Sequence, residues 1–264
     1  MSLTLIIILI ISGLFVGFIN TLSAGGTVIS IALYLALGIP APIANATNRI
    51  GVLIQSFSTG LMMKREGLID NKKTLRLAIP TMLGALVGSL LASVLTQNIF
   101  SYFMGAILIL MIFFLFMNPS KLSQDDKERL SKPVSLIKYI AFFGIGIYGG
   151  FIQVGTGFLL MTAGTMLIGY DIIKTNALKV SIMFLYTLVA MTVFIFDSQI
   201  YWSYGLVHSI GSIAGSWVAT KFALKKGANF VRWVVVIVII LTALNLFGII
   251  NLKSFFIDIL HYNI

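Results

Sequence analysis

Two basic residues of this chain lie inside or close to long apolar stretches, where a charge is costly. Arg49 lies 15 residues before the basic residue Lys64, a separation of about 22 Å along a helix. Lys179 lies near the start of another apolar stretch. A cation at membrane depth that lacks a carboxylate partner favours an anionic ligand. The alternative is that both side chains extend from the first turns of a helix to the lipid interface.

A glycine-rich break precedes each of these basic residues. The breaks run from Ser23 to Thr27 and from Val154 to Gly157. Glycine lets the chain unwind, and the short helix that follows presents free N–H groups and a partial positive charge at its N-terminus. Two such helix ends that face each other would bind an anion. The alternative is that the glycines only permit close packing of helices.

Hydroxyl and amide side chains near the breaks would add hydrogen-bond donors to such a site. Gln55 either joins two helices or lines the path, and we expect His208 to be a packed residue and not a ligand. The residues expected to contact the substrate are Asn20, Gly25, Gly26, Thr27, Thr47, Asn48, Arg49, Gln153, Gly155, Thr156, Gly157, Asn176 and Lys179.

Residues that the chain lacks exclude several kinds of chemistry. There is no cysteine, so disulfides and thiol catalysis are excluded. No carboxylate lies in the middle of an apolar stretch, so the usual proton relay of pumps and a carboxylate metal site are missing. No nucleophile elbow, zinc-protease motif or Walker A sequence occurs. We therefore expect no enzyme activity, no metal and no cofactor.

The composition is that of an integral membrane protein with many helices. Hydrophobic residues make up 59% of the chain and charged residues only 10%. The net charge of +10 does not indicate a nucleic-acid partner, because the basic residues gather in short segments between apolar runs, as cytoplasmic loops do. No Lys or Arg precedes the first apolar stretch, which we interpret as a membrane helix and not as a cleaved signal peptide.

The apolar stretches form two sets of about five helical elements each. Two of them, 27–38 and 157–169, are too short to cross about 30 Å of hydrocarbon as straight helices, and they predict broken or re-entrant helices. We expect a first membrane repeat at 1–117, a linker at 118–138, a second repeat at 139–250 and a tail at 251–264. The expected elements are 3–22, 27–38, 43–63, 77–95 and 99–117, then 139–154, 157–169, 176–196, 201–220 and 231–250.

Small residues and charges both indicate that the second half is an inverted copy of the first. Small residues four apart recur as Gly84, Gly88 and Ala92 in one half and as Gly211, Gly215 and Ala219 in the other. The positive-inside rule makes the basic segments 64–76, 118–138 and 221–232 cytoplasmic. The segment 64–76 follows the third element of the first half, whereas 221–232 follows the fourth element of the second half. The halves therefore have opposite orientations. This arrangement is typical of secondary transporters, which bind substrate at the repeat interface. Both termini would lie on the outer face.

The doubled pattern resembles the sulfite exporter TauE/SafE family over about residues 10–250. The motifs that carry the resemblance are Gly25-Gly26-Thr27, Gly38-Ile39-Pro40 and Ala44-Asn45-Ala46-Thr47-Asn48, with the two glycine pairs named above. The resemblance implies a multi-pass permease of the cell membrane for sulfite, sulfonates or other small anions. The second half departs from the family pattern, with Asn176-Ala177-Leu178-Lys179 where a Thr-Ser or Thr-Asn pair is more usual.

The leading hypothesis is a secondary transporter of a small anion, such as a sulfur oxyanion or a sulfonate. The expected partners are that anionic solute and the lipid bilayer, and a homo-oligomer is compatible with the sequence. Alternatives are a permease for a neutral or cationic molecule, in which both basic residues reach the lipid, and a non-transporting assembly subunit. A membrane enzyme is a further alternative, with His208 as its base.

Overall fold

A computed structural model describes residues 1–23, 25–116, 135–222, 237 and 239–251, which are helical and contain no strand. This confirms the all-α fold class. A further helical run covers 239–246. The helices are α1 (Leu3–Ser23), α2 (Thr27–Ala36), α3 (Ala41–Arg65), α4 (Asn71–Ser93), α5 (Gln97–Phe116), α7 (Leu136–Phe151), α8 (Thr156–Ala163) with a π-helical turn (Gly164–Ile168), α9 (Ile172–Phe196) and α10 (Trp202–Phe222).

Three helices of the described part are long and apolar enough to cross a membrane, namely Leu3–Thr21, Asn71–Ser93 and Ile172–Phe196. The apolar helices α2, α7 and α8 are shorter than a span. By contrast, α3 has 25 residues but carries Asn45, Asn48, Arg49 and Gln55. These four side chains are buried, so the polar face of α3 lies inside the protein, together with apolar residues such as Ile50 and Val52.

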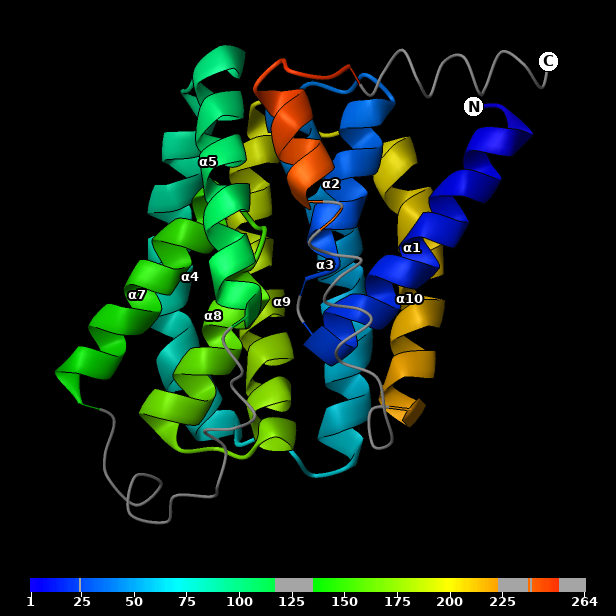
Figure 1. The fold of residues 1–264 in the computed structure, drawn as a ribbon. Helices are drawn as coiled ribbons and strands as arrows, with labels where there is room; N and C mark the ends of the chain where they lie inside the picture. The colour runs from blue at the N-terminus through cyan, green and yellow to red at the C-terminus, as the bar shows by residue number, and fades with distance from the viewer. Residues whose placement is uncertain (24, 117–134, 223–236, 238, 252–264) are drawn as a thin grey trace.

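The two short helices belong to two helix hairpins that enter the protein from opposite ends. In Figure 1, α1 runs from the top toward the middle and α2 returns to the top, whereas α7 rises from the bottom and α8 returns there. The long helices α3 and α9 run side by side between the hairpins (Figure 1). The inverted repeat itself stays a prediction. The orientation of the halves in a membrane stays a prediction.

Glycine holds each hairpin against a helix of the other half. A Cβ atom at Gly84 or Gly88 of α4 would overlap the carbonyl oxygens of Phe143 or Ile147 in α7. Gly211 and Gly215 of α10 meet the carbonyls of α1 in the same way. The backbones therefore touch at equivalent places in both halves, α4 against α7 and α10 against α1, and the predicted small-residue stripes are the contact surfaces.

Two helices begin earlier than the sequence indicated. We expected starts at residues 77 and 176, but α4 begins at Asn71 and α9 at Ile172. Asp70 caps α4 by accepting a hydrogen bond from the Lys73 N–H at 3.0 Å, and Asp171 caps α9 in the same manner. The segment 64–76 is therefore mostly helix, and its basic residues Lys72, Lys73 and Arg76 lie on the first turns of α4.

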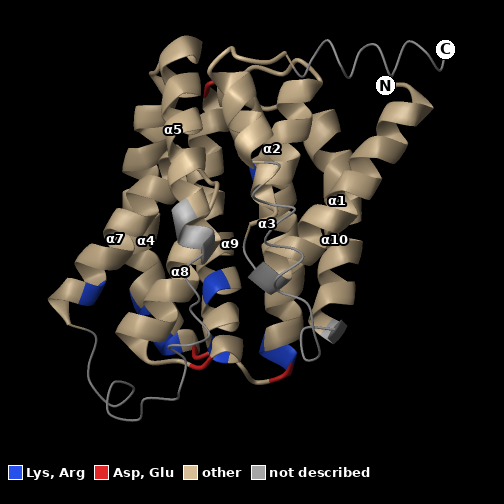
Figure 2. Ribbon diagram, in the orientation of Figure 1, with Lys and Arg blue, Asp and Glu red and all other residues tan. Residues whose placement is uncertain are grey.

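A contact at one end of the molecule joins the starts of α4 and α9. The Tyr170 hydroxyl donates to the Asp70 carboxylate at 3.4 Å, and the Lys73 ammonium lies 5.3 Å from the centre of the Tyr170 ring. Burial and the neighbouring Asp70 carboxylate raise the pKa of Tyr170 to about 12. Many of the Lys and Arg residues of the described part lie toward this end (Figure 2).

Several other boundaries differ by two or three residues, and some lie outside the described residues. α3 extends beyond the expected 43–63 at both ends, from Ala41 to Arg65, and α7 covers 136–151 in place of 139–154. The expected linker 118–138 lies outside the description up to residue 134, and its last residues belong to α7. The basic segment 221–232 and the tail 251–264 also lie largely outside it, as do residues 231–236 and 238 of the element 231–250.

Candidate functional site

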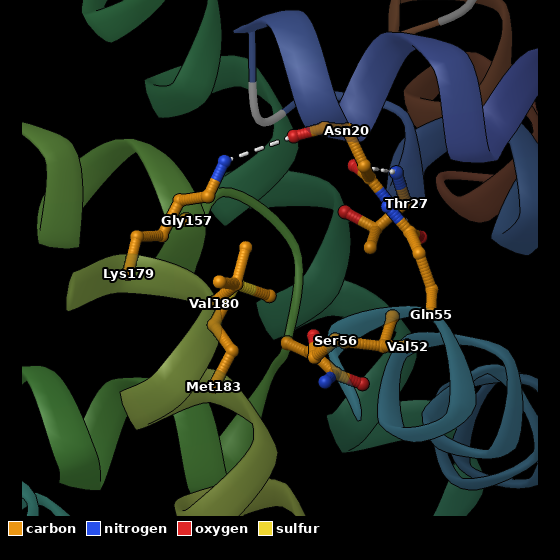
Figure 3. A pocket seen from close by; sticks show the side chains of 10 residues that line it. Asn20, Thr27, Val52, Gln55, Ser56, Gly157, Lys179, Val180 and Met183 are labelled. Atoms are coloured by element: carbon orange, nitrogen blue, oxygen red, sulfur yellow. Dashed lines mark hydrogen bonds between the residues drawn. The ribbon is translucent and has the colours of Figure 1, made fainter. Parts of the chain in front are cut away.

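A closed polar cavity lies between the two hairpins and the long helices α3 and α9 (Figure 3). Both halves line it, because Asn20 and Thr27 come from the first hairpin, and Gln153 and Gly157 from the second. The remaining lining residues are Val52, Gln55 and Ser56 of α3 and Lys179, Val180 and Met183 of α9. We call this space the central cavity.

Lys179 is the cation of the central cavity, and 2% of its surface is exposed. Its ammonium donates to the Asn20 carbonyl oxygen at 3.0 Å, near the C-terminal end of α1 (Figure 3). That end carries partial negative charge, which stabilises a cation. An ammonium has three N–H donors, and none of the described Asp or Glu residues lines the cavity. Lys179 therefore has N–H donors left to offer to an anion.

The Thr27 hydroxyl is a second donor in the central cavity, buried and without a hydrogen-bond partner among the described residues. It lies on the first residue of α2, where the backbone N–H of Thr27 donates to the Asn20 Oδ1 at 3.2 Å. A buried hydroxyl that lacks a partner costs free energy. A ligand oxygen at this position would remove that cost, because the hydroxyl donates to it.

Amide side chains hold the cavity wall in place on the side of the first hairpin. The Asn20 amide donates to Gln55 Oε1 at 3.4 Å, and the Gln55 amide donates to the Gly17 carbonyl at 3.3 Å. The sequence left the role of Gln55 open between packing and lining. Gln55 does both, because its side chain forms hydrogen bonds with α1 and also lines the central cavity.

A similar network lies on the side of the second hairpin. The Gln153 amide donates to the Thr187 hydroxyl at 3.0 Å, and its Oε1 accepts from the Asn48 amide at 3.5 Å. Ser30 donates to the Asn48 Oδ1, and the Asn45 Oδ1 accepts from the Gln153 backbone N–H at 3.3 Å. These contacts join both halves around one cavity, which is the arrangement expected for Asn20, Thr27, Asn48 and Gln153.

Arg49 is fully buried but does not line the central cavity. Its guanidinium donates to the carbonyl oxygens of Gly149 at 3.0 Å and Gly150 at 2.6 Å, at the C-terminal end of α7, and lies 4.8 Å from the Phe194 ring centre. The fork geometry of arginine suits two neighbouring carbonyls. Both basic residues thus bind the end of a broken helix from the other half, and the alternative in which they extend to lipid is wrong.

Other expected residues bond to neighbouring segments, although the Asn176 Oδ1 is buried without a hydrogen-bond partner among the described residues. The Thr47 hydroxyl accepts from the Tyr201 N–H at 3.0 Å, which ties α3 to the start of α10. The Asn176 amide donates to the Thr21 carbonyl at 3.4 Å, and the Thr156 hydroxyl donates to the Gln153 carbonyl at 3.1 Å. These three do not line the central cavity.

The glycines at the breaks serve different purposes. Gly157 lines the cavity, whereas Gly25 and Gly26 lie in the tight connection from α1 to α2. Gly155 has φ +76°, so its backbone favours glycine, and a Cβ there would also displace the flexible Met111 side chain. Close packing thus explains Gly26, where a Cβ would overlap the Val16 carbonyl, whereas anion binding at the helix ends stays a prediction.

The sequence did not single out Ser56 or Ser30, and it gave Asn45 only as part of the family motif. Ser56 faces the cavity, while Ser30 and Asn45 position Asn48 and Gln153. His208 packs against the Tyr34 ring at 5.8 Å between ring centres, and its Nδ1 lies 3.4 Å from the Ser212 hydroxyl. It does not line the central cavity. This placement counts against the membrane-enzyme alternative.

The central cavity is closed in this conformation. The space in which a water-sized group can be centred is about 10 Å³, enough for about one water molecule. An ion with several heavy atoms therefore needs the hairpins or the long helices to move apart before it binds.

Interrupted helices that meet at a closed polar cavity define a helical membrane transporter. Residues 9–246 match the sulfite exporter TauE/SafE family, and the chain belongs to that family. A probable membrane transporter protein of Haemophilus influenzae is 30% identical and covers 88% of this chain and 91% of its own length.

Two further relatives carry similar names. The probable membrane transporter protein ORF9 of Sinorhizobium is 28% identical, with 92% of each chain covered. The probable membrane transporter protein YfcA of Escherichia coli K12 is 26% identical and covers 84% of this chain and 82% of its own length. No solved structure matches the chain. The family and the names of these relatives support a membrane-embedded permease.

Proposed function

We propose that this protein is a secondary transporter of a small sulfur-containing anion, either an oxyanion such as sulfite or a sulfonate, in the cell membrane. The central cavity is its binding site. The family description names sulfite for the family, and the chemistry of the cavity supports an anion. The expected binding residues are Lys179, Thr27, Asn20 and Gln153, with the backbone at Gly157.

The observation that carries the proposal is Lys179, a buried ammonium in a cavity that no described carboxylate lines. A neutral ligand would leave this charge unbalanced, and a cationic ligand would be repelled by it. One ammonium balances one negative charge, which favours a singly charged anion over a doubly charged one. We assign Arg49 a positioning role, because its guanidinium holds the α7 carbonyls beside the cavity.

The test is flux of labelled sulfite, sulfate and a taurine-like sulfonate into liposomes that contain the purified protein. Lys179→Met removes the charge and keeps a similar length. Since a hydrogen bond to a charged group is worth about 1.5–3 kcal/mol, we expect flux below saturation to fall roughly 10-fold to 150-fold.

Lys174→Met is the matched control. Lys174 lies on the same helix, is 42% exposed and pairs with Asp171 at 3.3 Å at the helix start. Its variant should transport at the wild-type rate. Wild-type flux of every anion in Lys179→Met would show that the site is elsewhere, and no flux of any tested anion in the wild type would overturn the sulfur-anion function itself.

A further inference from the structure

A second and larger cavity, which is open at the protein surface, shares a lining residue with the central cavity. It lies between the C-terminal half of α3, the start of α4 and the middle of α9, and has a free volume of about 390 Å³. A water molecule occupies about 30 Å³ in the liquid, so this space has room for on the order of ten waters. We call it the lower cavity, since it lies toward the end of the molecule where α3 ends and α4 begins (Figure 1).

Ser56 connects the two spaces, because it lines both of them. On α3, residues before Ser56 line the central cavity and residues after it line the lower cavity. Val52 and Gln55 line the central cavity, and Phe57 and Gly60 line the lower one. Among the described residues Ser56 is shared by the two linings, so the two spaces are separate and the stretch of α3 between them is about one helical turn long.

The wall of the lower cavity is suited to an anion in transit. Lys64 lies at the outer end, and Ser56, Thr74 and Ser181 add hydroxyl groups along an otherwise apolar wall. Basic residues at the mouth of a narrow passage raise the local concentration of anions. Weak, spaced hydroxyl contacts let an ion enter without holding it tightly, as conduction requires.

Gly60 leaves room in this wall. A Cβ atom at Gly60 would meet no heavy atom within 4 Å, so glycine is not required there for packing. On one side of the cavity the rings of Phe57 and Phe184 stack with their centres 5.3 Å apart. The absence of a side chain at Gly60 keeps the passage open beside this pair.

We propose that the lower cavity is the vestibule through which the anion passes between the basic end of the molecule and the central cavity, with Gly60 keeping it open. This inference rests on the proposed transport function. It assigns one conformation, closed at the centre and open toward the basic end, and it places the barrier next to Ser56. The apolar wall also suits a lipid chain, an occupant that the experiment below distinguishes.

The first test places a large side chain in the vestibule. Gly60→Trp should lower anion flux at least tenfold in liposomes, because the indole fills the passage. Gly144→Trp is the control, since a side chain at Gly144 of α7 also meets no heavy atom within 4 Å and that residue lies outside both cavities. Its flux should stay at the wild-type rate. Equal flux in Gly60→Trp and wild type would overturn the vestibule and leave the transport function intact.

The second test does not depend on folding of the tryptophan variant. The chain has no native cysteine, so Gly60→Cys offers a single thiol to a methanethiosulfonate reagent that carries a sulfonate. We expect this water-soluble reagent to react and to block flux. Glu66→Cys at the exposed end of α3 should react without loss of flux. Absence of reaction at Gly60→Cys, as a lipid-filled cavity would give, or reaction without block, would each contradict the vestibule.

Discussion

At the scale of single residues, two buried cations are stabilised in the same way but serve different purposes. Arg49 uses two donors on the α7 carbonyls, whereas Lys179 uses one on the α1 carbonyl and faces the central cavity. A buried charge needs hydrogen bonds on its donors. The arginine has two of its five N–H donors on backbone carbonyls and does not line the cavity, whereas the lysine does line it, so the two should respond differently to substitution.

We expect Arg49→Met to lower stability more than any exposed basic substitution. The change leaves the carbonyls of Gly149 and Gly150 without donors inside the protein. The expected loss is about 3 kcal/mol, which corresponds to a melting temperature roughly 6–12 °C lower. Thermal unfolding in detergent measures it. Arg65→Met, on the exposed end of the same helix, should melt like wild type, and equal melting of both variants would exclude the positioning role.

The sequence predicted which residue types surround the cavity better than it predicted where they point. Asn20, Thr27, Gln153 and Lys179 do line it. Arg49 and Thr47 face other partners, because α7 and the start of α10 offer a carbonyl pair and an N–H that only tertiary packing brings near. Ser56 was not singled out, since a serine in a membrane helix is as suited to packing as to lining.

At the scale of helices, each hairpin depends on a backbone contact that leaves no room for a side chain. A Cβ at Gly88 would overlap the Ile147 carbonyl, and a rigid backbone cannot move away as a side chain can. Gly88→Leu should therefore separate α4 from α7 and cost at least about 3 kcal/mol. We expect low yield of monodisperse protein in gel filtration and a lower melting temperature.

Gly144→Leu is the control for that prediction, because the same substitution there meets open space. It should leave the melting temperature within a few degrees of the wild-type value. If Gly88→Leu were as stable as Gly144→Leu, the α4–α7 backbone contact would not hold the hairpin.

The short helices could be predicted because the length of an apolar run is a local property of the sequence, and it can be compared directly with the thickness of the membrane. Thr27–Ala36 and the helical segment from Thr156 to Ile168 lie close to the expected ranges 27–38 and 157–169. The starts of α4 and α9 were wrong by several residues. The predicted starts were late because hydropathy marks only apolar residues, whereas these helices begin with polar turns that Asp70 and Asp171 cap.

At the scale of the whole molecule, the inverted arrangement of the two halves stays a prediction in its membrane orientation, and single cysteines can test it. Glu66 follows α3 and Asp197 follows α9, at equivalent helix ends. In a chain without native cysteine, Glu66→Cys should react with an impermeant thiol reagent only from the cytoplasmic side. Asp197→Cys should react only from the outer side. Labelling of both from one side would refute the inverted orientation.

The pairing of α1 with α10 also has a consequence for biosynthesis. α1 packs on a helix that begins only at Trp202, so it leaves the ribosome long before its partner exists. At about 5–20 residues per second the nascent α1 waits on the order of 10–40 s, with the glycine face that α10 covers exposed to lipid or to an insertase. During that interval the newly made protein is most exposed to quality-control proteases. A ribosome that stalls before α10 would release a fragment that such proteases recognise.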